Sequence, residues 1–174
     1  MTLKLLKYTI IGLSIVWIGI IQVNFAKEPA RVIAGWVENV RIQNLNFNVK
    51  AKLDTGAKTS SIHAKDIELF SKDDKKWVRF ALVLRDSEDT VHELKLEKKL
   101  IRRVRIKSQD DKDDSRYVVM LDVCFNGRTY STEFTLSDRD EFIYDVLIGR
   151  RFLKRTAIVD VNQAFLTVTD CDKN

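Results

Sequence analysis

The tripeptide Asp54-Thr55-Gly56 is the part of this sequence whose residue types and position could support chemistry. Taken alone it is weak evidence, because Asp and Gly are common turn residues and a turn is the more frequent explanation. Its context adds weight, since the alternating residues 47–53 bring the Asp54 carboxylate out of an apolar layer. A second apolar run that ends in Gly-Arg, residues 146–150, follows about 95 residues later. The two segments together predict a carboxylate at the end of a half-buried strand, where it can take up or release a proton.

With these segments in this order, the chain resembles the retropepsin-like aspartic proteases, in which Asp-Thr-Gly-Ala follows one strand and an apolar Gly-Arg segment precedes a terminal helix. The similarity is greatest to a bacterial branch that carries the label ATP-dependent zinc protease. It rests on residues 51–64, AKLDTGAKTSSIHA, and 147–150, LIGR, and it covers roughly residues 33–168. The resemblance implies a mostly β fold, a retropepsin-like closed β-barrel with one short C-terminal helix, and an aspartic-type endopeptidase activity.

An aspartic mechanism requires two carboxylates a few ångströms apart. One must be ionised to take a proton from water, while the other stays protonated and polarises the scissile carbonyl. The chain has a single Asp-Thr-Gly, so two copies must meet and share one proton between their Asp54 carboxylates. The resemblance therefore predicts an obligate homodimer. It also implies that Gly56 lets the loop turn tightly and that the Thr55 hydroxyl forms a hydrogen bond across the pair.

Other site residues are assigned by the same resemblance. Ala57, Lys58 and His63 are expected to bind substrate, whereas Gly149 and Arg150 are expected to have a structural role. Retroviral proteases usually carry an acidic residue at the position of Lys58. The usual acidic partner of Arg150 is therefore missing, and Arg150 is expected to pair elsewhere.

A basic segment lies on the predicted flap. Residues 95–107 contain seven Lys or Arg and a single Glu, with apolar residues interleaved. Such a strip favours an anionic substrate, and the resemblance implies glutamate-rich peptides, so Arg103 and Arg105 are expected to bind an acidic peptide. A solvated face balanced by the Asp-rich residues 110–114 explains the pattern equally well. The flap also differs from the retroviral one, because residues 78–115 contain no Gly for a flexible tip.

The sequence does not support other catalytic chemistries. His92-Glu93 is the nearest approach to the zinc motif His-Glu-x-x-His, but Leu96 stands where the second His belongs. No Gly-x-x-x-x-Gly-Lys-Ser/Thr loop is present to hold ATP phosphates, and no Gly-x-Ser-x-Gly elbow accompanies Ser60 or Ser61. We therefore expect no metal, no ATP and no other cofactor.

The elements that must position Asp54 are mostly strands. Alternation of polar and apolar residues predicts them at residues 33–42, 47–53, 78–84, 91–96, 117–125, 129–136 and 164–168. Asn126-Gly127 predicts a tight hairpin between two of these strands. A short helix is predicted at residues 151–155, and residues 138–140, Asp-Arg-Asp, are interpreted as a turn with local ion pairing.

The chain divides into an N-terminal segment, residues 1–26, and one peptidase domain, residues 27–174. Residues 8–26 carry no charge and would span about 28 Å as a helix, which matches a bilayer core. Because Lys4 and Lys7 precede them, the positive-inside tendency places the domain beyond the membrane. The segment is therefore expected to be a membrane anchor or a signal peptide, and the domain to lie in the bacterial periplasm.

The composition of the chain excludes several other classes of protein. With 45% hydrophobic residues and a single Pro, the 174-residue chain can bury one core, or two small ones, and is not disordered. The net charge of +5 falls to +3 without the first 26 residues, which carry two Lys and no acid, and this excess is too small to indicate a nucleic-acid binder. Cys124 and Cys171 permit one disulfide but not a four-thiolate zinc site. The competing hypothesis is a non-catalytic peptide-binding or scaffold module that keeps the fold but lacks the paired carboxylates.

Overall fold

The computed structural model describes residues 30–43, 45–106 and 114–171. Within these ranges no helix has the length and apolar character needed to cross a membrane. The predicted anchor or signal segment, residues 8–26, lies outside the described residues.

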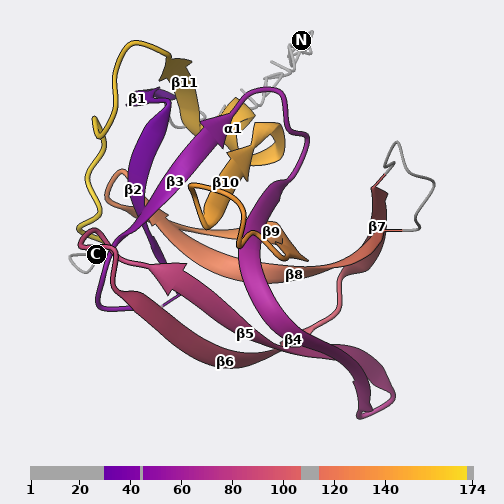
Figure 1. Cartoon of the computed structure of the whole chain (residues 1–174). Coiled ribbons are helices and arrows are strands. Elements are labelled where there is room, and N and C mark those ends of the chain that lie inside the picture. Colours follow the sequence, from indigo (N-terminus) through magenta and orange to yellow (C-terminus); the bar gives the residue numbers. More distant parts are fainter. Residues whose placement is uncertain (1–29, 44, 107–113, 172–174) are drawn as a thin grey trace, which may run out of the picture.

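The described part of the chain is built almost entirely of strands (Figure 1). In chain order the elements are β1 Val32–Gly35, β2 Val37–Ile42, β3 Val49–Asp54, β4 Ser60–Lys72, β5 Lys75–Arg85, β6 Val91–Lys99, β7 Arg102–Ile106, β8 Asp114–Phe125, β9 Arg128–Ser137, β10 Val146–Gly149, α1 Arg150–Thr156 and β11 Ala157–Asp160.

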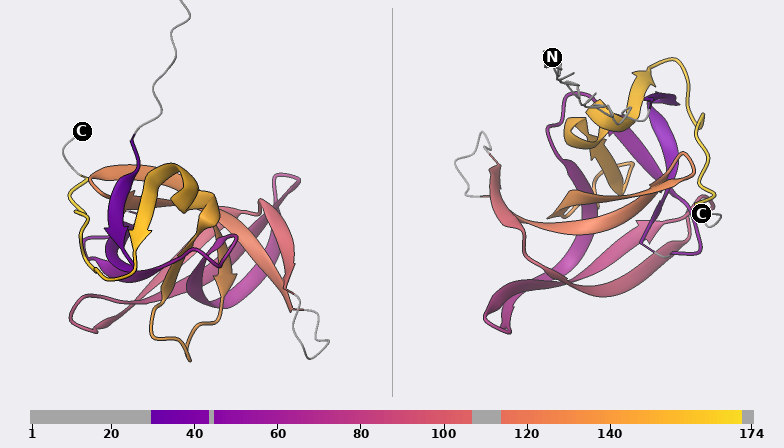
Figure 2. Two further views of the ribbon diagram at one scale, coloured as in Figure 1. Left: turned by 90° about the horizontal axis from the view of Figure 1, so that it is seen from above. Right: turned by 180° about the vertical axis from the view of Figure 1, so that it is seen from behind.

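Six of these strands close into a barrel. They pair in the order β10-β3-β2-β8-β9-β4, and β10 also pairs with β4, which completes the ring. β5 and β6 continue the sheet outward from β4, β7 pairs with β8, and β1 and β11 form a separate parallel pair. Figure 2 shows the barrel from two further sides. The predicted mostly β barrel with one short helix is confirmed.

The barrel interior explains why these residues form strands. In β3, Val49, Ala51 and Leu53 are buried, while Lys50 and Lys52 alternate with them on the other face. The same alternation in the other strands fills the interior with apolar side chains. These include Val40, Ile42, Ile62, Leu121, Val123, Phe134, Leu136, Val146 and Ile148.

Two strand predictions are corrected by the structure. The strand expected at residues 33–42 is broken at Trp36, where the chain leaves β11 and enters the barrel as β2. The expected strand at residues 164–168 does not form. Phe165 has a φ of 57°, which interrupts an extended backbone, and the N–H groups of Leu166 and Thr167 donate to the Glu38 carboxylate and not to a neighbouring strand.

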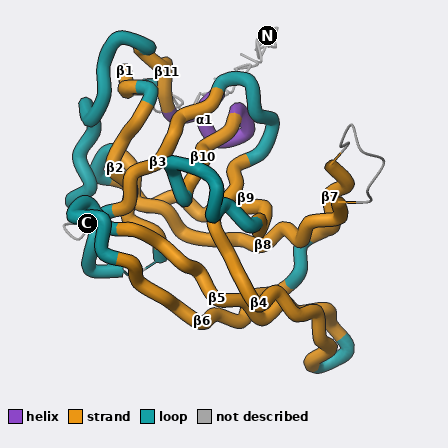
Figure 3. Tube along the Cα trace, in the orientation of Figure 1, coloured by secondary structure: helices purple, strands orange, loops and turns teal. Residues whose placement is uncertain are grey.

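The C-terminal segment, residues 161–171, is thus a loop that lies along the barrel (Figure 3). Its far end is fixed by a disulfide between Cys124 on β8 and Cys171, with 5.9 Å between the two Cα atoms. Its middle is fixed by Glu38, whose fully buried carboxylate accepts hydrogen bonds from Gly35, Leu166 and Thr167. The sequence allowed this disulfide without requiring it, and gave no signal for the role of Glu38.

Replacing Glu38 by Gln is expected to lower the free energy of unfolding by about 1–3 kcal/mol. The amide keeps the shape but offers one acceptor oxygen where several buried N–H groups now donate, so some of them lose their partner. Urea unfolding of the full chain measures the change, with Glu88→Gln in an exposed turn as the matched control. Equal stability of the two variants would contradict this role.

Candidate active site

The Asp54 carboxylate sits at the end of β3 and is held by the loop that follows it. Its Oδ1 accepts hydrogen bonds from the backbone N–H of Gly56, at 2.8 Å, and of Ala57, at 3.0 Å. Oδ2 lies 3.8 Å from Lys52 Nζ, and the Asp54 side chain is 25% exposed. The loop therefore fixes one carboxylate oxygen and leaves the group open to solvent, as a reacting carboxylate requires.

The second predicted segment does meet the first. β10 pairs with β3 in parallel, so Gly149 lies opposite Asp54. Arg150, the next residue, donates from its backbone N–H to the Ala57 carbonyl, at 2.9 Å. Its Nη1 donates to the carbonyl groups of Thr55, at 3.0 Å, and Gly56, at 2.6 Å. The expected alternative partner of Arg150 is therefore the backbone of the Asp54 loop itself.

Gly149 makes the closest approach between the two segments. A Cβ at this position would lie 2.6 Å from the carbonyl carbon and oxygen of Thr59. The Gly149 N–H donates to the Ser60 hydroxyl, at 3.2 Å. The structural role expected of Gly149 thus has a specific cause, which is backbone contact without room for a side chain.

The surface next to Asp54 is exposed in a single copy. Thr55, Gly56 and Lys58 are exposed and Ala57 is half-buried. Within the described ranges, Asp54 bonds to no second carboxyl group, and its ion pair is with Lys52. One copy therefore presents one carboxylate where an aspartic mechanism requires two.

His63 lies in β4 and is buried, with 2% of its surface exposed. Its ring Nδ1 accepts a hydrogen bond from the Arg139 backbone N–H, at 2.7 Å, and the backbone N–H of His63 donates to the Asp145 carbonyl, at 2.8 Å. Both partners belong to the loop between β9 and β10, which projects from the barrel in Figure 2. His63 thus fixes this loop, and its expected contact with substrate stays a prediction.

His63, Asp138 and Asp140 form a cluster whose ligand atoms lie within 4.8 Å of one another. A metal would need a free lone pair on the imidazole. Nδ1 already accepts from Arg139, so the ring proton is on Nε2, which lies 3.2 Å from Asp140 Oδ1. Asp140 also pairs with Lys65, at 2.6 Å. This cluster fits an ion-pair network better than a metal site.

The described part of the basic segment, residues 95–106, is divided between two strands. Its first part lies in β6, which pairs with β5, and its second part lies in β7, which pairs with β8, so these residues do not form one flap. Arg103 and Arg105 lie in β7, which forms a hairpin with β8, and both are exposed. The Arg103 guanidinium stacks over the Tyr117 ring at 5.0 Å. Their expected role in binding an acidic peptide stays a prediction.

Glu133 on β9 connects the β7–β8 hairpin to helix α1. Its Oε2 accepts from Arg102 on β7 and from Arg151 on α1, each at 2.6 Å. The hydrogen bond from Arg102, together with the charge of both guanidinium groups, lowers the pKa of Glu133, although burial acts in the opposite direction. The ionised form of Glu133 is therefore favoured in the folded state.

The stabilising effect of Glu133 is expected to depend on pH. Because its folded pKa lies below the ordinary value of 4.5, the contribution is complete above that pH and is lost as the pH falls through the folded pKa. Near neutral pH, Glu133→Gln should thus be less stable than the native protein, and in acid the two should be equally stable. The loss near neutral pH should be less than about 1 kcal/mol, because the groups of this ion pair are partly exposed. Urea unfolding from neutral to acidic pH measures the difference in stability between Glu133→Gln and the native protein. Replacement of the exposed Glu141 by Gln serves as the control. A difference that persists in acid would refute the ion-pair explanation.

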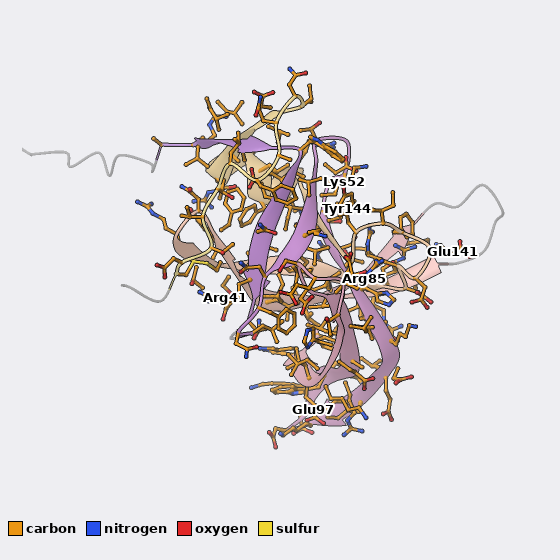
Figure 4. All side chains as sticks on the ribbon, turned by 60° about the vertical axis from the view of Figure 1, so that its left-hand side comes forward. Arg41, Lys52, Arg85, Glu97, Glu141 and Tyr144 are labelled. Atoms are coloured by element: carbon orange, nitrogen blue, oxygen red, sulfur yellow. A yellow bond between two sulfur atoms is a disulfide. The ribbon has the colours of Figure 1, made fainter. Side chains whose placement is uncertain are left out.

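Arg139 lies beside His63, and its contacts were not predicted from the sequence. The local ion pairing expected at residues 138–140 is wrong, because Arg139 is buried and reaches Ser61 on β4. Asp140 pairs instead with Lys65, far away in sequence. Figure 4 shows the loop through Glu141 and Tyr144, together with Arg85 and Lys52. Only the fold brings these groups together, so no local pattern could have revealed them.

Comparisons with known proteins agree with this geometry. A family model described as RimB-like, "Retropepsin-like aspartic endopeptidase RimB", matches residues 33–170. A solved structure, protein Lpg0085 of unknown function from Legionella pneumophila, has a TM-score of 0.66 and 27% identity, and the match covers 80% of this chain and all of that one.

Several curated relatives are described as "Probable alpha-L-glutamate ligase". The protein from Shewanella pealeana is 35% identical over 118 residues, which are 67% of this chain and 25% of that protein. The protein from Desulfotalea psychrophila is 34% identical over 120 residues, 64% of this chain and 24% of that protein. The chain thus spans about a quarter of the length of these relatives. From the family match and the Asp54 loop, the chain belongs to the RimB-like family of retropepsin-like aspartic endopeptidases.

Proposed function

We propose that the chain is an aspartic-type endopeptidase that acts as a homodimer, with Asp54 of two copies facing one water molecule. The observation that carries this proposal is the Asp54 loop. The Arg150 side chain holds this loop by donating hydrogen bonds to the carbonyl groups of Thr55 and Gly56, and these two loop residues are exposed to solvent. Membership of a family of aspartic endopeptidases supports the same activity.

The proposed reaction follows from two carboxyl groups that share one proton. The ionised carboxylate takes a proton from water, whose oxygen attacks the scissile carbonyl carbon, while the protonated carboxyl donates a hydrogen bond to the carbonyl oxygen. As the tetrahedral intermediate collapses, the C–N bond breaks and a proton passes to the leaving amine. In the observed loop, the N–H groups of Gly56 and Ala57 would hold the Asp54 carboxylate in position through these steps.

The proposed substrate is an acidic, glutamate-rich peptide. Arg103 and Arg105 on β7 supply positive charge that would attract such a chain. Relatives whose names describe glutamate ligases contain a region similar to this chain, which supports a link to glutamate-containing peptides.

We also propose that the domain works beyond the cytoplasm, in the bacterial periplasm, anchored or exported through residues 8–26. The disulfide between Cys124 and Cys171 supports this location, because such bonds persist in oxidising compartments.

A cleavage assay tests the proposed function. The full chain is incubated in ¹⁸O-labelled water with a peptide that has a run of Glu between two fluorophores. We expect internal cleavage, with one ¹⁸O atom in the new carboxylate, because the attacking oxygen comes from water. Tight binding without any cleavage would instead support the non-catalytic peptide-binding module.

A further inference from the structure

The strands beside Asp54 form one continuous surface. Leu147 on β10 lies opposite both Lys52 on β3 and Ser61 on β4, and Ser61 lies opposite Thr135 on β9. Residues opposite each other in a sheet share a face. Lys52 and Asp54 are two residues apart, so they share that face as well. Ser61 and Thr135 therefore belong to the surface that carries Asp54, roughly 12 Å from it or a little more by strand spacing.

Arg139 reaches this surface from the loop between β9 and β10. Its Nη1 donates to the Ser61 hydroxyl and its Nε to the Tyr144 carbonyl, both at 3.0 Å. The guanidinium stacks on the Phe142 ring at 4.5 Å, and only 6% of Arg139 is exposed. A fixed cation is thus placed on the same face as Asp54.

The charge of Arg139 is not neutralised by a contacting acid in the described part of the chain. Its hydrogen bonds go to a hydroxyl and a carbonyl, and its Nη2 donates to no described group. Burial lowers the pKa of Arg139, and the charge of Arg116 acts in the same direction, although Asp145 and Asp54 oppose them. A buried cation without an anion is costly, so the site favours an anionic ligand.

Two acids of this loop, Asp145 and Asp140, already have cationic partners. Asp145 forms an ion pair with Arg85, whose Nε and Nη2 both reach it. Asp140 pairs with Lys65, at 2.6 Å. Arg139 is therefore the cation of this loop that remains available to a ligand.

Thr135 provides an independent observation. Its Oγ1 is buried and has no hydrogen-bond partner among the described residues, and the residue is 3% exposed. Buried hydroxyl groups without a partner are rare in folded proteins. The adjacent Ser61 hydroxyl accepts from Arg139 and keeps its own proton to donate. Two hydroxyl groups and a guanidinium therefore offer donors to one region.

We infer that Arg139, Ser61 and Thr135 form the subsite that binds an acidic side chain of the substrate. A carboxylate there would accept from Arg139 Nη2 and from the two hydroxyl groups, which neutralises the buried cation and satisfies Thr135. At about 3.3 Å per residue of extended peptide, the distance to Asp54 assigns the acidic side chain to a residue roughly four or five positions from the scissile bond. This inference rests on the proposed function in one respect, namely that the Asp54 face binds a peptide.

Selectivity measurements test this inference. Two peptides that differ only in having Glu or Gln roughly four or five positions from the scissile bond are offered to the full chain and its variants. Arg139→Gln should lower kcat/KM for the Glu peptide by about 10- to 100-fold and leave the Gln peptide nearly unchanged, and Arg139→Lys should recover part of the loss. Thr135→Val should lower the Glu preference by a smaller factor. Arg128→Gln, an exposed cation on β9, is the matched control.

Binding of the same peptides to Asp54→Asn, with and without Arg139→Gln, separates this inference from the proposed function. If the native protein cleaves neither peptide, but the tighter binding of the Glu peptide to Asp54→Asn depends on Arg139, the peptidase proposal fails and the subsite stands. An equal loss on both peptides would show that Arg139 only fixes its loop, which overturns the inference. A Glu preference that is lost in Arg103→Gln and kept in Arg139→Gln overturns it too.

Discussion

Replacing Asp54 by Asn is expected to lower peptide turnover by about 10²- to 10⁴-fold, since the variant loses proton transfer to and from the reacting groups. The fold should be retained, because the Asn side-chain oxygen can still accept from Gly56 and Ala57. Initial rates on the Glu peptide, measured alongside the thermal unfolding midpoint, give both quantities.

The matched control for this change is Asp122→Asn, which alters an exposed carboxylate on β8. It should leave both turnover and stability unchanged. Peptide cleavage that survives in Asp54→Asn at the native rate would exclude the aspartic mechanism, whatever the oligomeric state.

Replacing Gly149 by Ala is expected to lower the free energy of unfolding by roughly 3 kcal/mol or more. The new Cβ would lie 2.6 Å from backbone atoms of Thr59, so either β10 or the loop after Asp54 must move. Because Arg150 is the next residue, its hydrogen bonds to the Asp54 loop would be displaced and turnover should fall as well. Urea unfolding and the cleavage assay measure the two effects.

Gly127→Ala provides the comparison for this variant. Gly127 has a positive φ of 70°, but a Cβ there meets nothing closer than 3.7 Å. Its substitution should cost only about 1 kcal/mol and leave turnover intact. If the two variants were equally stable, close packing at Gly149 would not be the reason for a glycine there.

The sequence predicted the fold best where burial alternates regularly. β3 follows the expected pattern, and the hairpin at Asn126-Gly127 and the short helix after Gly149 also form. Residues 164–168 alternate in the same way but form no strand, because the buried Glu38 carboxylate takes the N–H groups that a strand would need. Alternation reports which side chains are buried, and it does not report what the backbone bonds to.

The candidate site was predicted where its residues are close in sequence or belong to a recognisable segment. Asp54 and Arg150 were found in this way, and the structure joins them through backbone carbonyl groups. Arg139 and Thr135 were not found, since their significance depends on Ser61, which strand pairing places beside them. Such contacts across strands leave no periodic signal in a single sequence.

The most direct test of the central claim is a mixing experiment with two copies of the full chain. Native protein and Asp54→Asn are combined in equal amounts and allowed to exchange subunits, and a mixture with Asp122→Asn serves as control. If each site needs Asp54 from both copies, about one quarter of the dimers stay active, so the rate per total protein falls to about one quarter of the native value. A rate of one half in a mixture whose subunits have exchanged, as native mass spectrometry shows, would mean that one copy is sufficient and would contradict the account.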